Sequence, residues 1–227
     1  MRRSLSPASR PGPKHIYDQR RLQAIALRWD GKAADWDQNL EDPACHLNED
    51  QAYQRFLDQA LYIIRRRRTF CAGQGVIDAG CATGLVLARV GAWFAWGIGV
   101  DISPEMIRLA QEKQIPKAKF LVRDCFRLAS RCPKAGAVVS RGVLLSHYGP
   151  RQGALLLKSA HDCLVERGFV FLDFLNKASR DQYHHVPHNK TYFEPEEVCE
   201  LASCAGFRTA QIYGDQERRV RMVLATK

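Results

Sequence analysis

The pattern of hydrophobic and polar positions divides the 227-residue chain into three parts. Residues 1–15 are rich in Pro, Ser and Arg and lack apolar periodicity, which is typical of a disordered tail. In residues 16–73 the stretch AYQRFLDQALYIIRR, at 52–66, has apolar residues at every third or fourth position and predicts a helix. From residue 74 the apolar residues form short runs that end in Gly, Asp or Asn, a pattern that favours strands.

These short runs predict seven strands, at residues 75–78, 97–101, 119–123, 137–140, 168–174, 208–213 and 220–225. Helices are predicted between them, at residues 85–94, 104–113, 151–165 and 194–205, with a short irregular connection at 126–135. Alternating strands and helices predict a doubly wound, Rossmann-like α/β fold whose seven-stranded sheet is mostly parallel. The last two strands lie a hairpin-length gap apart, so we expect them to be antiparallel at one edge.

We therefore interpret the chain as a disordered basic tail at residues 1–15 and a single domain at residues 16–227. Within the domain, residues 16–73 form an N-terminal helical layer or lid, and residues 74–227 form the Rossmann-like core. The length suits one catalytic or binding domain.

The first predicted strand runs into the tight turn VIDAGCATG, residues 76–84, in which Asp78 closes the strand. Gly80, Ala82 and Gly84 keep the turn small, so a ligand could approach the backbone there. A strand-to-helix turn needs glycine even when it binds nothing. This motif alone leaves both interpretations open.

Two more acids close the next two strands: Asp101 follows GIGV, and Asp124 follows FLVR. Asp101 is placed where a carboxylate can accept both ribose hydroxyls of an adenosine-containing ligand. Its alternative role is to cap the following helix, which Ser103 could also do. Because the carboxyl ends of parallel strands meet at one edge of the sheet, three acids there predict a binding site.

These motifs together resemble the class I S-adenosylmethionine-dependent methyltransferases of the small-molecule type. The resemblance covers about residues 30–227 and rests on VIDAGCATG, GVDISPEMIRLA, VRDC, VVSRGVLLSHY and YFEPEEVCELASCAGF. Two positions depart from the family pattern: Ala82 stands where glycine is common, and Arg167 precedes Gly168 where a glycine pair is usual.

The resemblance implies S-adenosylmethionine as the cofactor, S-adenosylhomocysteine as the product, and transfer of a methyl group to oxygen or nitrogen of a small molecule by in-line displacement. It places Asp78 and Gly80 near the methionine amino group and Asp101 on the ribose. Ile102 and Met106 would border the adenine. The full set of cofactor-binding residues expected from the resemblance is Trp36, Asp78, Gly80, Cys81, Ala82, Gly84, Asp101, Ile102, Met106, Asp124, Cys125 and Arg141.

Acceptor residues are expected on loops above the same strand ends. His147 is the candidate general base, because an imidazole with a pKa near 6.5 suits proton removal at neutral pH. The alternative is that His147 caps the next helix or is half-buried. The candidate substrate-binding residues are Tyr148, Asn176, His184 and Tyr192. The histidines at 184, 185 and 188 could equally belong to a solvated loop, and residues 35–37 could contribute to the lid.

Charge and cysteine content weigh against other classes of function. The net charge is +10, but residues 1–21 hold six basic residues against one acid, and residues 65–68 are four arginines. The rest is nearly neutral, which disfavours a nucleic-acid methyltransferase that uses the basic tail, the closest alternative function. A dehydrogenase would need G-x-G-x-x-G. A non-catalytic scaffold would have less reason to keep all three acids.

The remaining expectations concern location and assembly. The most apolar stretch, residues 85–100, contains Arg89 and three glycines, so we expect no membrane span. The N-terminus breaks into Ser and Pro before any apolar run, and the 8 cysteines include no CxxC pair, so a cytoplasmic protein with reduced thiols is expected. His161, Cys163, Cys199 and Cys204 lack zinc-site spacing, so no metal is expected. A monomer or homodimer fits this size.

Overall fold

The computed structural model describes residues 19–41, 51–142, 144–182 and 190–227. Its centre is a seven-stranded sheet in the order β3-β2-β1-β4-β5-β7-β6. The strands are β1 (Gly75–Ala79), β2 (Trp96–Asp101), β3 (Ala118–Val122), β4 (Ala135–Ser140), β5 (Leu164–Leu175), β6 (Thr209–Tyr213) and β7 (Val220–Thr226). The first five are parallel, and β7 pairs antiparallel with both β5 and β6. The predicted doubly wound fold with an antiparallel C-terminal pair is confirmed.

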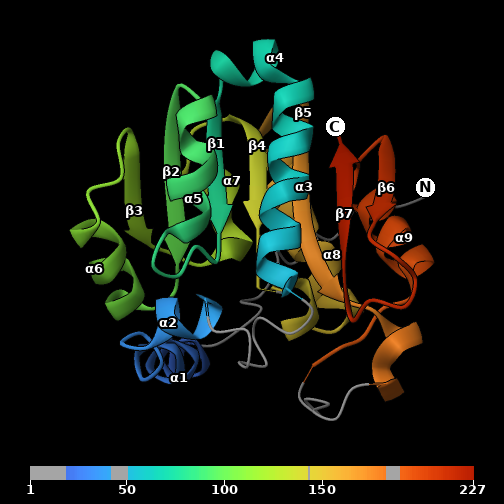
Figure 1. The fold of residues 1–227 in the computed structure, drawn as a ribbon, viewed down its shortest axis with the longest axis horizontal. Coiled ribbons are helices and arrows are strands. Elements are labelled where there is room, and N and C mark those ends of the chain that lie inside the picture. The colour runs from blue at the N-terminus through green and yellow to red at the C-terminus, as the bar shows by residue number, and fades with distance from the viewer. Residues whose placement is uncertain (1–18, 42–50, 143, 183–189) are drawn as a thin grey trace, which may run out of the picture.

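Helices cover both faces of this sheet (Figure 1). They are α1 (Gln19–Asp30), α2 (Trp36–Glu41), α3 (Ala52–Arg66), α4 (Arg68–Ala72), α5 (Leu85–Val90), α6 (Pro104–Glu112), α7 (Leu128–Arg131), α8 (Pro150–Cys163) and α9 (Pro195–Ala205). The helix predicted at 85–94 is shorter than expected: α5 gives way at Gly91 to a 3-10 turn, and the chain is extended at Phe94. The helix predicted at 151–165 ends two residues early, because β5 already begins at Leu164.

Each face of the sheet has its own hydrophobic core. Along β1 the side chain of Val76 belongs to the core under α3 and α5, whereas Ile77 belongs to the core under α8 and α9. Such alternation follows from the two-residue period of a strand. Because both faces are covered, the central strands are mostly apolar, with acids such as Asp78 and Asp101 at or near their carboxyl ends.

The N-terminal helices do not form one uniform layer. Helix α3 buries Phe56, Leu57 and Ile64 in the core on one face of the sheet. Helices α1 and α2 lie instead across the carboxyl ends of the parallel strands (Figure 1). These two helices therefore cover the edge where the sequence predicts a site. No helix within the described ranges has the length and apolar character that crossing a membrane requires.

Candidate functional site

The glycine-rich turn after β1 is held against β2 by its backbone. The N–H groups of Gly80 and Cys81 both donate to the carbonyl oxygen of Val100, at 2.8 and 3.0 Å. Gly80 has φ of 74° and Gly84 has φ of 83°, and a Cβ at Gly84 would lie 2.8 Å from the ring of Phe120. Glycine is therefore required at position 84 by both conformation and space. Ala82 adopts φ of 46°, a left-handed conformation that a non-glycine residue rarely takes.

Asp101 ties this turn to the start of α6. Its Oδ2 accepts a hydrogen bond from the N–H of Ala82, and its Oδ1 accepts one from the N–H of Ser103, both at 2.9 Å. Burial raises the pKa of Asp101, while these backbone hydrogen bonds oppose that rise. The cap of α6 is Ser103, whose Oγ accepts from the N–H of Met106 at 3.1 Å. Each Asp101 oxygen can still accept a second hydrogen bond, so its structural role leaves room for a ligand hydroxyl.

Asp78 is a buried carboxyl group without a partner among the described residues. Its side chain is fully buried, and neither carboxyl oxygen has a hydrogen-bond partner in the described ranges. Burial, and then the negative charge of Asp101, raise the pKa of Asp78 to about 8. A buried carboxylate is unfavourable unless a cation or donors accompany it. A cationic ligand group above the turn, such as the ammonium of a methionine moiety, would be attracted by the Asp78 carboxylate buried beneath it.

A cavity of about 260 Å³ opens at the carboxyl ends of the parallel strands. Its size is close to the lower end of the range for small-molecule sites, which begins at about 300 Å³. Many residues expected from the sequence line it: Trp36, Gly80, Ala82, Asp101, Ile102, Met106, Asp124, Cys125, Arg141, His147 and Tyr148. The structure adds a second group: Leu22, Ile25, Arg28, Trp29, Gly142, Leu144 and Lys190. The fold thus gathers segments from residue 22 to residue 190 around one cavity.

Helix α1 forms the outer wall of this cavity. Leu22, Ile25 and Trp29 all line it, and their spacing of three and four positions places them on one face of the helix. The rings of Trp29 and Trp36 meet edge to face, with centroids 5.8 Å apart. The apolar periodicity of α1 is the sequence signal that could have identified these residues, although its polar surroundings obscure it.

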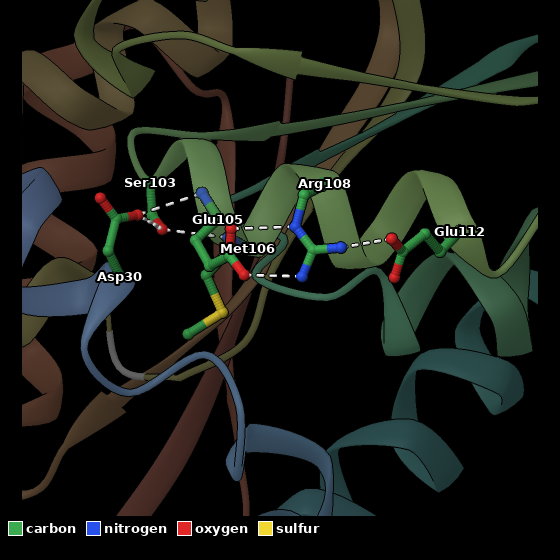
Figure 2. A network of polar contacts seen from close by, with 6 residues as sticks. All are labelled: Asp30, Ser103, Glu105, Met106, Arg108 and Glu112. Carbon is green, nitrogen blue, oxygen red and sulfur yellow. Dashed lines mark hydrogen bonds and ion pairs between the residues drawn. The ribbon is translucent and has the colours of Figure 1, made fainter.

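The last residue of α1 anchors that helix to the start of α6 (Figure 2). The hydroxyl of Ser103 donates to Oδ1 of Asp30 at 2.5 Å, and the N–H of Glu105 donates to the same oxygen at 3.1 Å. A carboxylate at a helix N-terminus is favourable, because it meets unpaired N–H groups and the positive end of the helix dipole. Farther along α6, Arg108 pairs with Glu112 on the exposed surface, where such a pair adds little stability.

Three predicted cofactor residues lie outside the cavity lining. Asp78 and Cys81 are buried below the turn, and burial raises the pKa of the Cys81 thiol. Gly84 begins α5 and is packed against Phe120. These three positions shape the turn from beneath. Cys125 does line the cavity, and burial raises the pKa of its thiol, so it stays protonated.

His147 lies in surroundings that make its imidazole less basic than usual. Its ring lines the cavity, but burial and the nearby charges of Lys190, Arg28 and Lys32 lower its pKa to about 3. Nζ of Lys190 lies 2.6 Å from both ring nitrogens of His147. The imidazole is therefore neutral near pH 7 and a much weaker base than a pKa near 6.5 implies. The sequence could not reveal this, because the cations come from segments about 40 and 120 residues away in the chain.

Two predicted substrate residues do not reach the cavity. Asn176 is fully buried, and its Nδ2 donates to the carbonyl oxygens of Gln216 and Arg218, at 2.7 and 3.0 Å. It fastens the end of β5 to the loop between β6 and β7. Tyr192 lies under the guanidinium of Arg180, whose Cζ is 5.6 Å from the ring centroid. His184, the remaining candidate, lies outside the described residues.

Comparison with known proteins supports the fold. Residues 76–168, which run from β1 into β5, match the family model described as a methyltransferase domain. Over this stretch, which is less than half of the chain, the sequence is similar to the class I S-adenosylmethionine-dependent methyltransferases. This family uses S-adenosylmethionine as its methyl donor.

Solved structures share the fold of this chain. Magnesium protoporphyrin IX methyltransferase from Synechocystis PCC 6803, crystallised with S-adenosylhomocysteine, superposes with a TM-score of 0.71 at 16% identity, covering 90% of this chain and 99% of that chain. A methyltransferase from Clostridium acetobutylicum gives a TM-score of 0.68 at 12% identity, covering 84% of this chain and 98% of that chain.

A curated relative gives a partial sequence match. The ubiquinone biosynthesis O-methyltransferase of Albidiferax ferrireducens is 28% identical over 116 residues, which are 48% of this chain and 44% of that relative. The match thus spans less than half of the relative's length.

Proposed function

We propose that this protein transfers the methyl group of S-adenosylmethionine to oxygen or nitrogen of a small-molecule acceptor. What supports the proposal above all is the cavity at the strand ends, where the turn after β1 and the acids Asp101 and Asp124 meet the aromatic wall of α1. Two of the proteins named above carry a small molecule in their names, ubiquinone in one and magnesium protoporphyrin IX in the other. Closure of the cavity by a helix favours a compact acceptor over a polymer.

When bound, S-adenosylmethionine supplies an electrophilic methyl group, whose bond to sulfur breaks as the acceptor's lone pair forms the new bond. The residues of this chain then have three tasks: to bind, to align and to exclude water. Asp101 would accept the ribose hydroxyls, and Asp78 would face the methionine ammonium. Trp29 and Trp36 would shield the cavity from water. His147 would contact the acceptor as a neutral imidazole, which can donate or accept one hydrogen bond.

Calorimetric titration with S-adenosylhomocysteine tests the cofactor part of the proposal. The full chain should bind it, and Asp101→Ala should weaken binding about 30-fold or more, because it removes charge-assisted hydrogen bonds worth about 2 kcal/mol or more. Glu112→Ala, an exposed acid on α6, is the matched control and should bind like the parent. A folded Asp101→Ala that binds as tightly as the parent would refute the assignment of Asp101.

The acceptor part requires a transfer assay. The protein is incubated with S-adenosylmethionine labelled in its methyl group and with the metabolite, RNA and protein fractions of a cell extract. Label should enter the metabolite fraction. Labelling of RNA alone would overturn the small-molecule assignment and favour the nucleic-acid alternative.

A further inference from the structure

Three basic side chains and one imidazole surround the indole of Trp29. The guanidinium carbon of Arg28, Nζ of Lys32 and Nζ of Lys190 lie 6.0, 5.3 and 6.0 Å from its ring centroid. The ring of His147 lies 5.4 Å away, centroid to centroid. All of these residues except Lys32 line the cavity. Positive charge is therefore concentrated on one side of it, and we call Arg28, Lys32 and Lys190 the basic cluster.

The members of the basic cluster repel one another. The pKa of Lys190 falls to about 7, first because the amine is largely buried and then because of the charges of Arg28 and Lys32. Within the described residues, no carboxylate contributes to the pKa of Lys190. The face of an indole offsets part of such repulsion. An anion among these groups would offset much more, since it would interact favourably with every member.

The acids of this region are engaged elsewhere. Asp30 accepts hydrogen bonds from the start of α6, and Asp37 pairs with Lys113 at 2.5 Å. Both acids that line the cavity accept hydrogen bonds from the backbone: Asp101 from the N–H groups of Ala82 and Ser103, and Asp124 from the N–H of Phe126. None of these carboxylates is placed to neutralise the basic cluster. Among the described residues no carboxylate supplies the charge that balances the basic cluster, and a ligand could supply it.

We propose that the basic cluster is the subsite for an anionic group of the methyl acceptor, and that the acceptor is a small molecule carrying a carboxylate or a phosphate. Arg28 and Lys190 bind the anion, Lys32 strengthens the attraction from the rim, and Trp29 packs against the apolar part of the molecule. This inference rests on the proposed function. It narrows the acceptor from any small molecule to an anionic one with a hydrophobic or planar body.

Benzoate and benzamide are suitable probes, because they share a shape and differ in charge. With S-adenosylhomocysteine at saturation, calorimetric titration should show benzoate binding about tenfold or more tightly than benzamide, as expected when an ion meets charged donors. Inorganic phosphate should compete with benzoate. Lys190→Met and Arg28→Gln should each weaken benzoate binding about tenfold. Lys158→Met, the same change on the exposed surface of α8, should leave it unchanged.

Proton uptake gives a readout that a merely structural role would not produce. Because the pKa of Lys190 is about 7, its amine carries a proton in about half of the molecules at pH 7. An anion beside it raises that pKa, so benzoate binding should take up about half a proton, measured by titration in two buffers of different ionisation enthalpy. The groups facing this amine are Arg28, Lys32 and His147. Lys190→Met should abolish the uptake, which separates it from any uptake by His147.

Two results would overturn the inference. One is equal binding of benzoate and benzamide. The other is that Lys190→Met and Arg28→Gln weaken S-adenosylhomocysteine instead of benzoate, which would assign the basic cluster to the carboxylate of the cofactor. Failure of the proposed function looks different: the parent would not bind S-adenosylhomocysteine at all. The preference for benzoate could then still be measured in the protein alone.

Discussion

Replacement of Asp78 by asparagine should change the pH dependence of stability in a defined direction. The carboxyl group has a pKa of about 8 in the folded chain and a reference value of 3.8. The folded state therefore holds this proton more tightly than the unfolded state does, and stability falls as pH rises between these values. Each pKa unit corresponds to about 1.4 kcal/mol. When Asp78 is fully ionised, its raised pKa therefore lowers the free energy of unfolding by about 6 kcal/mol, and at pH 7 the loss is already about 4 kcal/mol.

Other groups in the cavity have the opposite sign. The lowered pKa values of His147 and Lys190, about 3 and about 7, make stability rise with pH, between about 3 and 6.5 for the imidazole and between about 7 and 10.5 for the amine. A single pH curve of the parent would mix these effects. They are present in both proteins, so the difference between parent and Asp78→Asn isolates the aspartate.

The assay is urea unfolding of both proteins at pH 5 and pH 8. The stability of Asp78→Asn relative to the parent should increase by about 4 kcal/mol between these two pH values. This change is a large share of the free energy of unfolding of an ordinary domain, which is about 5 to 15 kcal/mol. Parallel curves would refute the conclusion that a buried, ionisable carboxyl lies below the turn. If the curves diverge but S-adenosylhomocysteine binds both proteins equally, Asp78 does not face the methionine ammonium.

Three further substitutions test separate parts of the structure. Ala82→Gly should raise the free energy of unfolding by up to about 1 kcal/mol, because φ of 46° strains alanine. The melting temperature should rise by about 2–4 °C, and a lower melting temperature would contradict this prediction. Asp30→Ala should make α1 more sensitive to limited proteolysis and weaken S-adenosylhomocysteine binding, whereas Glu112→Ala should do neither. Asn176→Ala should destabilise the fold by about 2–3 kcal/mol in urea unfolding, because two buried hydrogen bonds are lost. Its affinity for S-adenosylhomocysteine should not change, and weaker binding would indicate that Asn176 belongs to the site.

The fold was predictable because its strands are buried on both faces. A strand such as β4, Ala135–Ser140, is buried throughout and is therefore an uninterrupted apolar run between polar loops. The position of the site follows from topology, since ligands of doubly wound sheets bind at the carboxyl ends of the strands. Asp101 and Asp124 were found by that rule alone. Local pattern and topology thus located the part of the cavity formed by β1, β2 and β3.

The other wall of the cavity could not be predicted in this way. Arg28 reaches the cavity because α1 crosses the strand ends. Lys190 reaches it because the chain before α9 returns to the loop after β4, where the N–H of Thr191 donates to the carbonyl oxygen of Ser146 at 2.8 Å. Neither contact has a local sequence signal. Asn176 shows a related effect: it does follow a strand, but the loop between β6 and β7 lies beside it, and its amide donates hydrogen bonds to that loop.

The charges around the cavity are separated by sign, and this separation connects the two proposals. In the part of the chain that the structure describes, no cation accompanies Asp78 below the turn after β1, and no anion accompanies the basic cluster beside α1. An unpaired buried carboxylate and an unpaired group of cations are each unfavourable. The two do not neutralise each other, because Asp78 and the basic cluster lie in different parts of the site. A methionine ammonium at Asp78 and an acceptor anion at Lys190 would relieve them one at a time. The two ligands would then bind at opposite charges, with the aromatic wall of Trp29 and Trp36 beside them.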